Sequence, residues 1–277
     1  MNSQFKLALL IQVIYPVTLI LSLWSLMMTT ITDPGIIPKA SKNDPSLQSF
    51  GVTPKKRDGS ISSDRSSEKL VRSNARRLDE ECVALVEGHE VPVAKCRTCN
   101  VFKPPRSFHC SDCNACIEVH DHHCPWVGTC VGKRNHKYFL SFAVTTSLHA
   151  IITAIISGLY LKMEKYGEDD DDGSWSVRHM VGIVLLGFTL LIVCCVGGLG
   201  CYHSKLACSG ATTNEEMRGK ISEFNPYDQG CTQNCRAFCY KSQSRVYTGE
   251  DYDVNEVAKR EPNVFKIVPK SQTETFQ

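Results

Sequence analysis

The sequence predicts an α-helical multi-pass membrane protein, with three transmembrane helices and a cysteine-rich zinc-binding module inserted between the first and the second. Two observations carry this prediction. Three long stretches contain no formally charged residue, and seven of the 15 cysteines crowd into one short segment. The formal net charge of +2 is close to zero, so the chain as a whole gives no reason to expect attraction to nucleic acid.

The three apolar stretches are residues 7–31, 138–161 and 181–202. Each exceeds the roughly 20 residues that an apolar helix needs to cross a bilayer. No amphipathic stripe marks any of them as a core helix of a soluble protein. The first stretch is longer than the 7–15 or so apolar residues of a signal peptide, and no small-residue cleavage pattern follows it. We therefore expect three uncleaved membrane helices.

Charge on the connecting segments predicts the orientation in the membrane. The loop after the first helix is rich in Lys and Arg, and so is the start of the C-terminal tail. The short loop at residues 163–177 is acidic, with four successive aspartates at 169–172. The positive-inside rule places the long loop and the tail in the cytosol and the acidic loop in the lumen or outside.

Amino-acid composition distinguishes three polar segments: a linker, a cysteine-rich module and a C-terminal tail. Residues 36–94 read as a cytosolic linker that is partly disordered, because residues 41–77 are rich in Ser, Lys, Asp and Gly and poor in apolar side chains. Residues 95–137 hold the compact cysteine-rich module. Residues 204–277 form a polar cytosolic tail, in which Asn225-Pro226 predicts a turn.

The module contains two CxxC pairs, Cys96/Cys99 and Cys110/Cys113, with the spacing of zinc knuckles. An odd cysteine total with CxxC pairs beside histidines favours metal binding in a reducing compartment over a secreted disulfide framework. Zinc takes four N or S ligands in a tetrahedron, so two pairs imply two ions, each needing two more ligands. Six cysteines and two histidines would fill two Cys3His sites and leave one cysteine and one histidine over. The candidates for the remaining positions are His109, Cys116, His122, His123, Cys124 and Cys130.

Asp121-His122-His123-Cys124, followed by Pro125-Trp126, resembles the signature of the DHHC family of protein S-acyltransferases (palmitoyltransferases). The resemblance extends beyond these four letters and runs from the first apolar stretch to about residue 240. It includes three further family motifs: a DPG at Asp33-Pro34-Gly35, an N-x3-F from Asn135 to Phe139, and a TTxE from Thr212 to Glu215.

Carried over position by position, the resemblance implies two interleaved structural zinc sites. The first would consist of Cys96, Cys99, His109 and Cys116, and the second of Cys110, Cys113, His123 and Cys130. Both ions would be saturated with protein ligands, so they would act as scaffold, because a catalytic zinc keeps an open position.

This assignment leaves His122 and Cys124 for catalysis. The resemblance implies that Cys124 accepts a fatty acyl group from palmitoyl-CoA and passes it to a cysteine thiol of a target protein. His122 would take the thiol proton and Asp121 would orient His122. Palmitoyl-CoA as co-substrate and two zinc ions are the only small partners expected.

Six more residues are candidates for binding the acyl-CoA or supporting the site. Thr212 or Thr213 would hydrogen-bond near Asp121, and Trp126 would lie at the membrane surface beside the thioester. For three of the others an ordinary alternative stays open. Lys103 and Arg106 would contact CoA phosphates or form a solvated basic face. His149 would close the acyl cavity or pack as a neutral residue against a neighbouring helix.

The sequence departs from the family because one apolar stretch, where most members have two, precedes the DHHC segment. The chain is then either a truncated form or a three-span member. A protein-binding zinc module without activity, or one serving as a subunit, is the alternative function. Nucleic-acid binding is disfavoured, because no recognition helix or basic stripe follows the ligands.

The expected partners are the bilayer, fatty acyl-CoA, membrane or peripheral proteins with exposed cysteines on the cytosolic face, and an accessory subunit. The expected location is an endomembrane (Golgi or endoplasmic reticulum) or the plasma membrane. Cys231, Cys235 and Cys239 recur every four residues, which places them on one face of a helix. We expect a partly buried face there, with self-acylation or a third metal cluster as alternatives.

Overall fold

The computed structural model describes residues 3–39, 82–86, 89–165, 177–221, 224–240 and 266–269. The predicted mobile linker at 41–77 and the acidic residues 169–172 lie outside these ranges. The chain divides into two compact units, which are described separately. We call the first, Met1–Thr32 with Asn135–Ser209 and Cys231–Tyr240, the helical unit. The second, Asp33–Arg134 with Gly210–Gly230 and Lys241–Gln277, is the cysteine unit.

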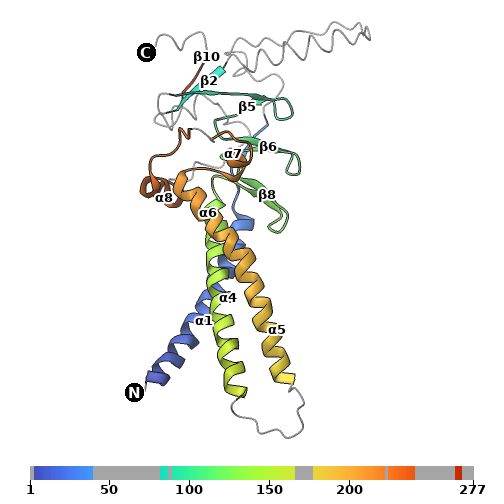
Figure 1. The fold of residues 1–277 in the computed structure, drawn as a ribbon. Coiled ribbons are helices and arrows are strands. Elements are labelled where there is room, and N and C mark those ends of the chain that lie inside the picture. Colours follow the sequence, from blue (N-terminus) through green and yellow to red (C-terminus); the bar gives the residue numbers. More distant parts are fainter. Residues whose placement is uncertain are drawn as a thin grey trace. The chain divides into compact units, whose positions relative to one another are not determined.

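Within its described residues, the helical unit has three helices long and apolar enough to cross a membrane, over Gln12–Ile31, His136–Met163 and Val177–Ser209. They correspond to α1 (Ser3–Ile31), α4 (His136–Lys165), and a third that begins as α5 (Val177–Ile192) and ends as α6 (Gly198–Ser209) (Figure 1). A π-helical turn, Val193–Gly197, joins α5 to α6. The third helix therefore extends beyond residues 181–202, and its last turn lies in what the sequence predicted as tail.

Hydrogen-bonded polar side chains lie in the contact between α1 and α4. Thr18, Ser22, Ser25 and Thr29 recur every three or four residues on one face of α1, and all are buried. Three of them meet α4 directly, in pairs whose numbering runs in opposite directions, as antiparallel helices require. The contacts are Thr18 Oγ1 to His149 Nδ1 at 2.9 Å, Ser22 Oγ to Thr146 Oγ1 at 2.6 Å and Ser25 Oγ to Ser141 Oγ at 3.0 Å.

The outward faces of the same helices are apolar. Ile20 and Leu23 of α1, Ile155 of α4 and Val184 and Leu191 of the third helix are all more than half exposed. A soluble helix buries such side chains and exposes its hydroxyls, whereas small polar residues at helix contacts and apolar residues outside are typical of helices in lipid. The helical unit is thus consistent with a membrane protein.

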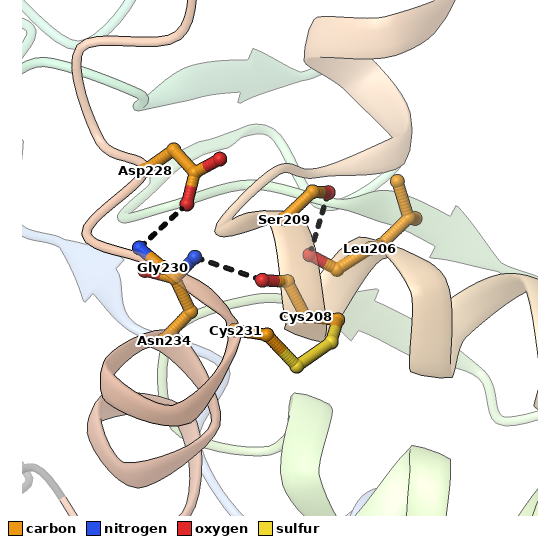
Figure 2. The surroundings of a disulfide bond; sticks show 7 residues. All are labelled: Leu206, Cys208, Ser209, Asp228, Gly230, Cys231 and Asn234. Atoms are coloured by element: carbon orange, nitrogen blue, oxygen red, sulfur yellow. Dashed lines mark hydrogen bonds between the residues drawn. A yellow bond between two sulfur atoms is a disulfide. The ribbon is translucent and has the colours of Figure 1, made fainter.

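A short helix, α8 (Cys231–Tyr240), packs against α6 and is held by two bonds. A disulfide joins Cys208 of α6 to Cys231, and Asn234 Nδ2 donates to the Cys208 carbonyl at 2.8 Å (Figure 2). The buried residue of α8 is Asn234, while Cys231 and Cys239 are exposed and Cys235 is half-buried. The expected partly buried face is therefore found at Cys235 and is wrong for Cys231 and Cys239. The buried position belongs to Asn234, whose amide reaches the last turn of α6.

Residues 95–131 of the cysteine unit form three hairpins. They are β4 (Lys95–Cys96) with β5 (Val101–Phe102), β6 (Phe108–Cys110) with β7 (Ala115–Ile117), and β8 (His122–Cys124) with β9 (Thr129–Val131). A strand from the predicted linker, β1 (Ile36–Ile37), pairs with β7. A separate sheet has the order β10 (Lys266–Pro269), β2 (Cys82–Val86), β3 (His89–Pro92). In the described part of this unit, the large aliphatic side chains that are fully buried are Ile37, Val93, Ile117 and Val131.

The DPG segment packs beside the hairpins because its backbone is locked and a glycine makes room for it. Asp33 Oδ1 accepts from the backbone N–H groups of Gly35 and Ile36, at 2.7 and 2.9 Å. Gly35 adopts a φ of +109°, which favours glycine. A Cβ on Gly132 would meet the Pro34 carbonyl oxygen at 2.5 Å, so only glycine allows this close approach.

Candidate metal and catalytic site

Strand register brings one histidine and one cysteine face to face in two of the hairpins. His109 on β6 is the direct partner of Cys116 on β7, and His123 on β8 is the direct partner of Cys130 on β9. Directly opposed residues have their Cβ atoms about 4.5–5.5 Å apart on the same face of the ladder. Each pair therefore presents an imidazole and a thiol to one point.

Two tight turns supply the remaining thiols. In each turn the second cysteine's backbone N–H donates to the first cysteine's sulfur: Cys99 to Cys96 at 3.4 Å and Cys113 to Cys110 at 3.5 Å. The residue after each pair, Asn100 or Asn114, has a positive φ, 56° and 48° respectively. Asparagine tolerates this left-handed conformation better than most residues. The chain can therefore reverse immediately after each CxxC.

The structure brings together two groups of four donors: Cys96, Cys99, His109 and Cys116, and Cys110, Cys113, His123 and Cys130. Within each group all ligand atoms lie within 4.8 Å of one another. These are the two groupings that the family resemblance implied. In the second group the Cys113 and Cys130 sulfurs are 3.5 Å apart, and His123 Nδ1 lies 3.4–3.6 Å from all three sulfurs.

These separations match the edges of a tetrahedron around zinc. With Zn–S near 2.3 Å and Zn–N near 2.0–2.1 Å, tetrahedral edges are about 3.8 Å between sulfurs and about 3.5 Å between nitrogen and sulfur. In the first group, His109 Nδ1 lies 3.4 Å from the Cys99 sulfur and 3.8 Å from the Cys116 sulfur. Both groups thus fit a tetrahedral cation bound through Nδ1 and three thiolates.

A 14-residue repeat relates the two groups, and the sequence analysis missed it. Adding 14 to Cys96, Cys99, His109 and Cys116 gives Cys110, Cys113, His123 and Cys130. Adding 14 to the second CxxC gives Cys124 and Val127, followed by Gly128, whose φ is +71° where the earlier turns have asparagine. Cys124 therefore starts a third turn of the same kind, in which valine replaces the second cysteine. The spacing of 14 between Cys96, Cys110 and Cys124 was the signal that could have revealed it.

Side-chain alternation along β8 separates the metal-facing residue from its neighbours. Successive residues of a strand point to opposite faces, so His122 and Cys124 share one face while His123 points to the other, toward its group. Neither His122 nor Cys124 belongs to either four-donor group in the described part of the chain.

Asp121 and His122 form a close pair. Asp121 Oδ2 lies 2.6 Å from His122 Nδ1, and the aspartate side chain is buried while the imidazole is partly exposed. The second carboxylate oxygen, Oδ1, accepts the backbone N–H of Thr213 at 2.8 Å. Because Nδ1 faces the carboxylate, Nε2 is the ring nitrogen of His122 on the side away from Asp121.

The helix that supplies the Thr213 N–H, α7 (Thr213–Met217), is itself fixed at its start. Thr212 and Glu215 form a capping box: Glu215 N–H donates to Thr212 Oγ1, and Thr212 N–H donates to the Glu215 carboxylate. Arg106 adds a bidentate contact to Glu215, with both N–O distances 2.7 Å. The guanidinium also donates to the Gly210 carbonyl at 2.8 Å and lies 4.4 Å from the Tyr227 ring centroid.

These contacts bear on the remaining predicted residues. Thr213 reaches Asp121 through its backbone, while the Thr212 side chain caps α7. Arg106 is committed to Glu215, which favours a structural role over a contact to CoA phosphates. In the helical unit, His149 bonds to Thr18, and its ring lies 4.5 Å from that of Tyr15. Trp126, two residues after Cys124, is 95% exposed.

Burial shifts several ionisable groups of the cysteine unit. It raises the pKa of the Cys116 and Cys130 thiols, so a cation bound there would have to displace their protons. Burial also raises the pKa of Tyr227 to about 12 and lowers the pKa of His120 to about 4. The His120 ring is therefore neutral near pH 7.

Comparison with known proteins agrees with this geometry. Residues 90–220 match the family model described as DHHC palmitoyltransferase. They hold all eight donors, the Asp121–His122 pair and α7. The chain therefore belongs to the DHHC palmitoyltransferase family.

Curated relatives cover most of this chain. It is 34% identical over 215 residues to "Palmitoyltransferase ZDHHC8" of Drosophila melanogaster, which is 77% of this chain and 19% of that protein. It is 30% identical over 223 residues to "Probable protein S-acyltransferase 5" of Arabidopsis thaliana, covering 80% and 44%. "Palmitoyltransferase ZDHHC5-B" of Danio rerio is 29% identical over 243 residues, covering 84% and 31%. The chain thus spans less than half the length of each of these relatives.

Proposed function

We propose that this protein is a protein S-acyltransferase, which moves a palmitoyl group from palmitoyl-CoA to cysteine thiols of target proteins through a thioester on Cys124. The single observation that carries the proposal is the position of Cys124. Cys124 begins a third turn like those of the two CxxC pairs, but valine stands where the second cysteine would be. Cys124 also shares a face of β8 with His122, whose Nδ1 lies 2.6 Å from Asp121 Oδ2. A thiol outside both donor groups, on the same strand face as an oriented imidazole, suits nucleophilic catalysis.

The reaction then follows from these three side chains. His122 Nε2 takes the Cys124 proton, and the thiolate attacks the thioester carbon of palmitoyl-CoA. The bond from that carbon to the CoA sulfur breaks, and His122 returns the proton to the CoA thiolate. In the second half, a target cysteine gives its proton to His122, and its thiolate attacks the carbonyl carbon of the Cys124 thioester. The bond from that carbon to the Cys124 sulfur breaks, and His122 returns the proton to Cys124. Each half exchanges one thioester for another, so no further energy source is required.

Asp121 serves as the orienting group. Its buried carboxylate accepts from His122 Nδ1–H and stabilises the imidazolium that forms when the thiol gives up its proton. The Thr213 N–H holds the other carboxylate oxygen and so fixes the direction of the pair.

The two four-donor groups would each hold a structural zinc ion. When bound, zinc supplies folding free energy, on the order of 10–16 kcal/mol apparent for a structural site. This matters here because, in the described part of the cysteine unit, Ile37, Val93, Ile117 and Val131 are the only large aliphatic side chains that are fully buried. With three thiolates and one imidazole each, neither site keeps an open position for substrate.

Membrane placement completes the proposal. The three apolar helices would cross a bilayer of the Golgi, endoplasmic reticulum or plasma membrane, with the cysteine unit on the cytosolic face. The exposed Trp126 ring would sit at the interface, where an amphipathic ring is favoured, and Lys103 would contact CoA phosphates. The targets would be membrane or peripheral proteins with exposed cysteines.

The test uses the full chain purified in detergent and incubated with labelled palmitoyl-CoA. Wild type should take up a label that hydroxylamine removes, as a thioester requires, and Cys124→Ser should take up none. Cys194→Ser serves as the matched control, because Cys194 is exposed and lies far along the chain in the π-helical turn; it should label like wild type. A wild-type chain that stays unlabelled while holding two zinc ions would refute the enzyme and leave a protein-binding module.

A further inference from the structure

His120 belongs to neither donor group and is not one of the residues proposed for catalysis, yet its side chain is buried. It directly precedes Asp121, and its Nε2 lies 3.7 Å from the sulfur of Cys130 in the second group. Its other nitrogen, Nδ1, lies 3.3 Å from the side-chain amide nitrogen of Asn214 in α7. The ring thus lies between a metal-binding sulfur and the helix that holds Asp121.

The direction of these two hydrogen bonds is fixed by a third. Arg218 Nε donates to Asn214 Oδ1 at 2.6 Å, which identifies the oxygen of that amide. The other atom is then the NH2 group, which can only donate, so His120 Nδ1 must accept. A neutral imidazole that accepts at Nδ1 carries its proton at Nε2, and that proton points at Cys130.

Ring contacts hold this chain of hydrogen bonds in place. The Arg218 guanidinium lies 4.2 Å from the Phe108 ring centroid, and the Phe108 and His120 ring centroids are 5.4 Å apart. Phe108 is the neighbour of the metal-facing His109 on β6. Arg218, Asn214 and His120 are therefore aligned toward the sulfur.

We propose that His120 is a positioning residue for the second metal site: its Nε2–H donates to the Cys130 thiolate, and Asn214 and Arg218 fix the tautomer that makes this possible. The inference rests on the proposed zinc sites. A hydrogen bond donated by an N–H group to a metal-bound thiolate spreads the negative charge of the sulfur and fixes the direction of the sulfur lone pairs. Outer-shell partners of this kind typically change metal affinity by about 10–100-fold.

The proposal also gives α7 two contacts to the site. Through the Thr213 N–H it fixes Asp121, and through Asn214 and His120 it reaches the second metal group. Loss of metal from the second group should therefore disturb the Asp121–His122 pair, because His120, Asn214 and the Thr213 N–H connect the two.

The test compares two substitutions that fill similar space. His120→Leu removes the donor, while His120→Gln keeps an N–H2 near the position of Nε2. Zinc affinity of the full chain is measured by competition with a chromogenic chelator. In His120→Leu, the affinity for one of the two zinc ions should fall by about 10–100-fold, and the affinity for the other should be unchanged. In His120→Gln, both affinities should stay within a few-fold of wild type.

A spectroscopic readout separates the hydrogen bond from simple packing. With cobalt(II) in place of zinc, the sulfur-to-metal charge-transfer band should move in His120→Leu and in Asn214→Leu, and return toward wild type in His120→Gln. Equal zinc affinity in wild type and His120→Leu would overturn the proposal. So would equal losses in the Leu and Gln variants, which would assign His120 to packing alone. A chain that binds two zinc ions but takes up no acyl label would refute the enzyme and leave this inference standing.

Discussion

At the scale of single residues, chemistry in the cysteine unit depends on which face of a three-residue strand each side chain occupies. His123 faces Cys130 across the ladder, while His122 and Cys124 alternate to the opposite face. Val127 stands where a second knuckle cysteine would complete a third turn. Two adjacent histidines can therefore have different partners, one a group of thiols and the other a carboxylate.

This difference predicts opposite outcomes for two substitutions in neighbouring hairpins. His109→Ala removes one ligand of the first group and should lose one zinc ion and much of the unit's stability, because three thiolates remain without their fourth partner. His122→Ala should keep two zinc ions and lose about 10²–10⁴-fold in acyl transfer, the usual contribution of a general base. Metal analysis and single-turnover acylation are measured on the same samples. Equal zinc loss in both variants would contradict the assignment.

Spacing explains which residue roles the sequence could predict. The eight donors fall at regular intervals within one short segment, and the resemblance named them by position. The contact from Arg106 to Glu215 joins residues from distant parts of the chain, and no local pattern predicts that pairing. For Arg106 the sequence leaves open a contact to CoA phosphates or a solvated basic face, and neither alternative includes the guanidinium's contact with the Glu215 carboxylate.

At the scale of elements, α7 has only five residues and depends on contacts outside itself. Isolated helices of this length are unstable in water, because ordering the backbone of the first turn costs more free energy than the hydrogen bonds of one turn provide. Its capping box and the Arg106 pair supply the missing free energy. The side chains of this ion pair are largely shielded from solvent, at 17% and 8% exposure.

We therefore expect Glu215→Ala to release α7. The change removes the capping box and leaves the Arg106 charge without its carboxylate, which for a buried pair typically costs about 3–5 kcal/mol. Acyl transfer should fall because the Thr213 N–H no longer holds Asp121. At saturating zinc the chain should still bind two ions, because all eight donors remain, although the second site loses the support of Asn214. Thr213→Ser is a matched control, because it keeps the backbone N–H. Full activity in Glu215→Ala would show that α7 is not needed to position Asp121.

At the scale of the whole molecule, the two units are stabilised by different means. The helical unit pairs buried hydroxyls between α1 and α4 and exposes apolar side chains, as lipid permits. The cysteine unit brings together eight side chains that could hold metal ions. Hydropathy alone predicted the three long helices, because length and lack of charge suffice for that. It did not predict the extension of the third helix to Ser209, the π-helical turn or the Cys208–Cys231 disulfide, since these depend on contacts with α4 and α8.

Removal of metal should therefore affect the units unequally. A strong zinc chelator should make six more thiols titratable, those of Cys96, Cys99, Cys110, Cys113, Cys116 and Cys130, and should expose the cysteine unit to protease. The helical circular dichroism should change little, because the helical unit contributes none of the eight donors. Loss of helix in parallel with zinc would contradict this independence.

The central claim is that eight side chains bind two metal ions and leave Cys124 as the acyl carrier. Native mass spectrometry of the full chain after incubation with palmitoyl-CoA measures both halves of the claim at once. We expect wild type to carry two zinc ions and one palmitoyl group, mapped by peptide analysis to Cys124, and Cys124→Ser to carry two zinc ions and no acyl group. A Cys124→Ser chain that loses a zinc ion, or a palmitoyl group mapped to one of the six ligand cysteines, would contradict it.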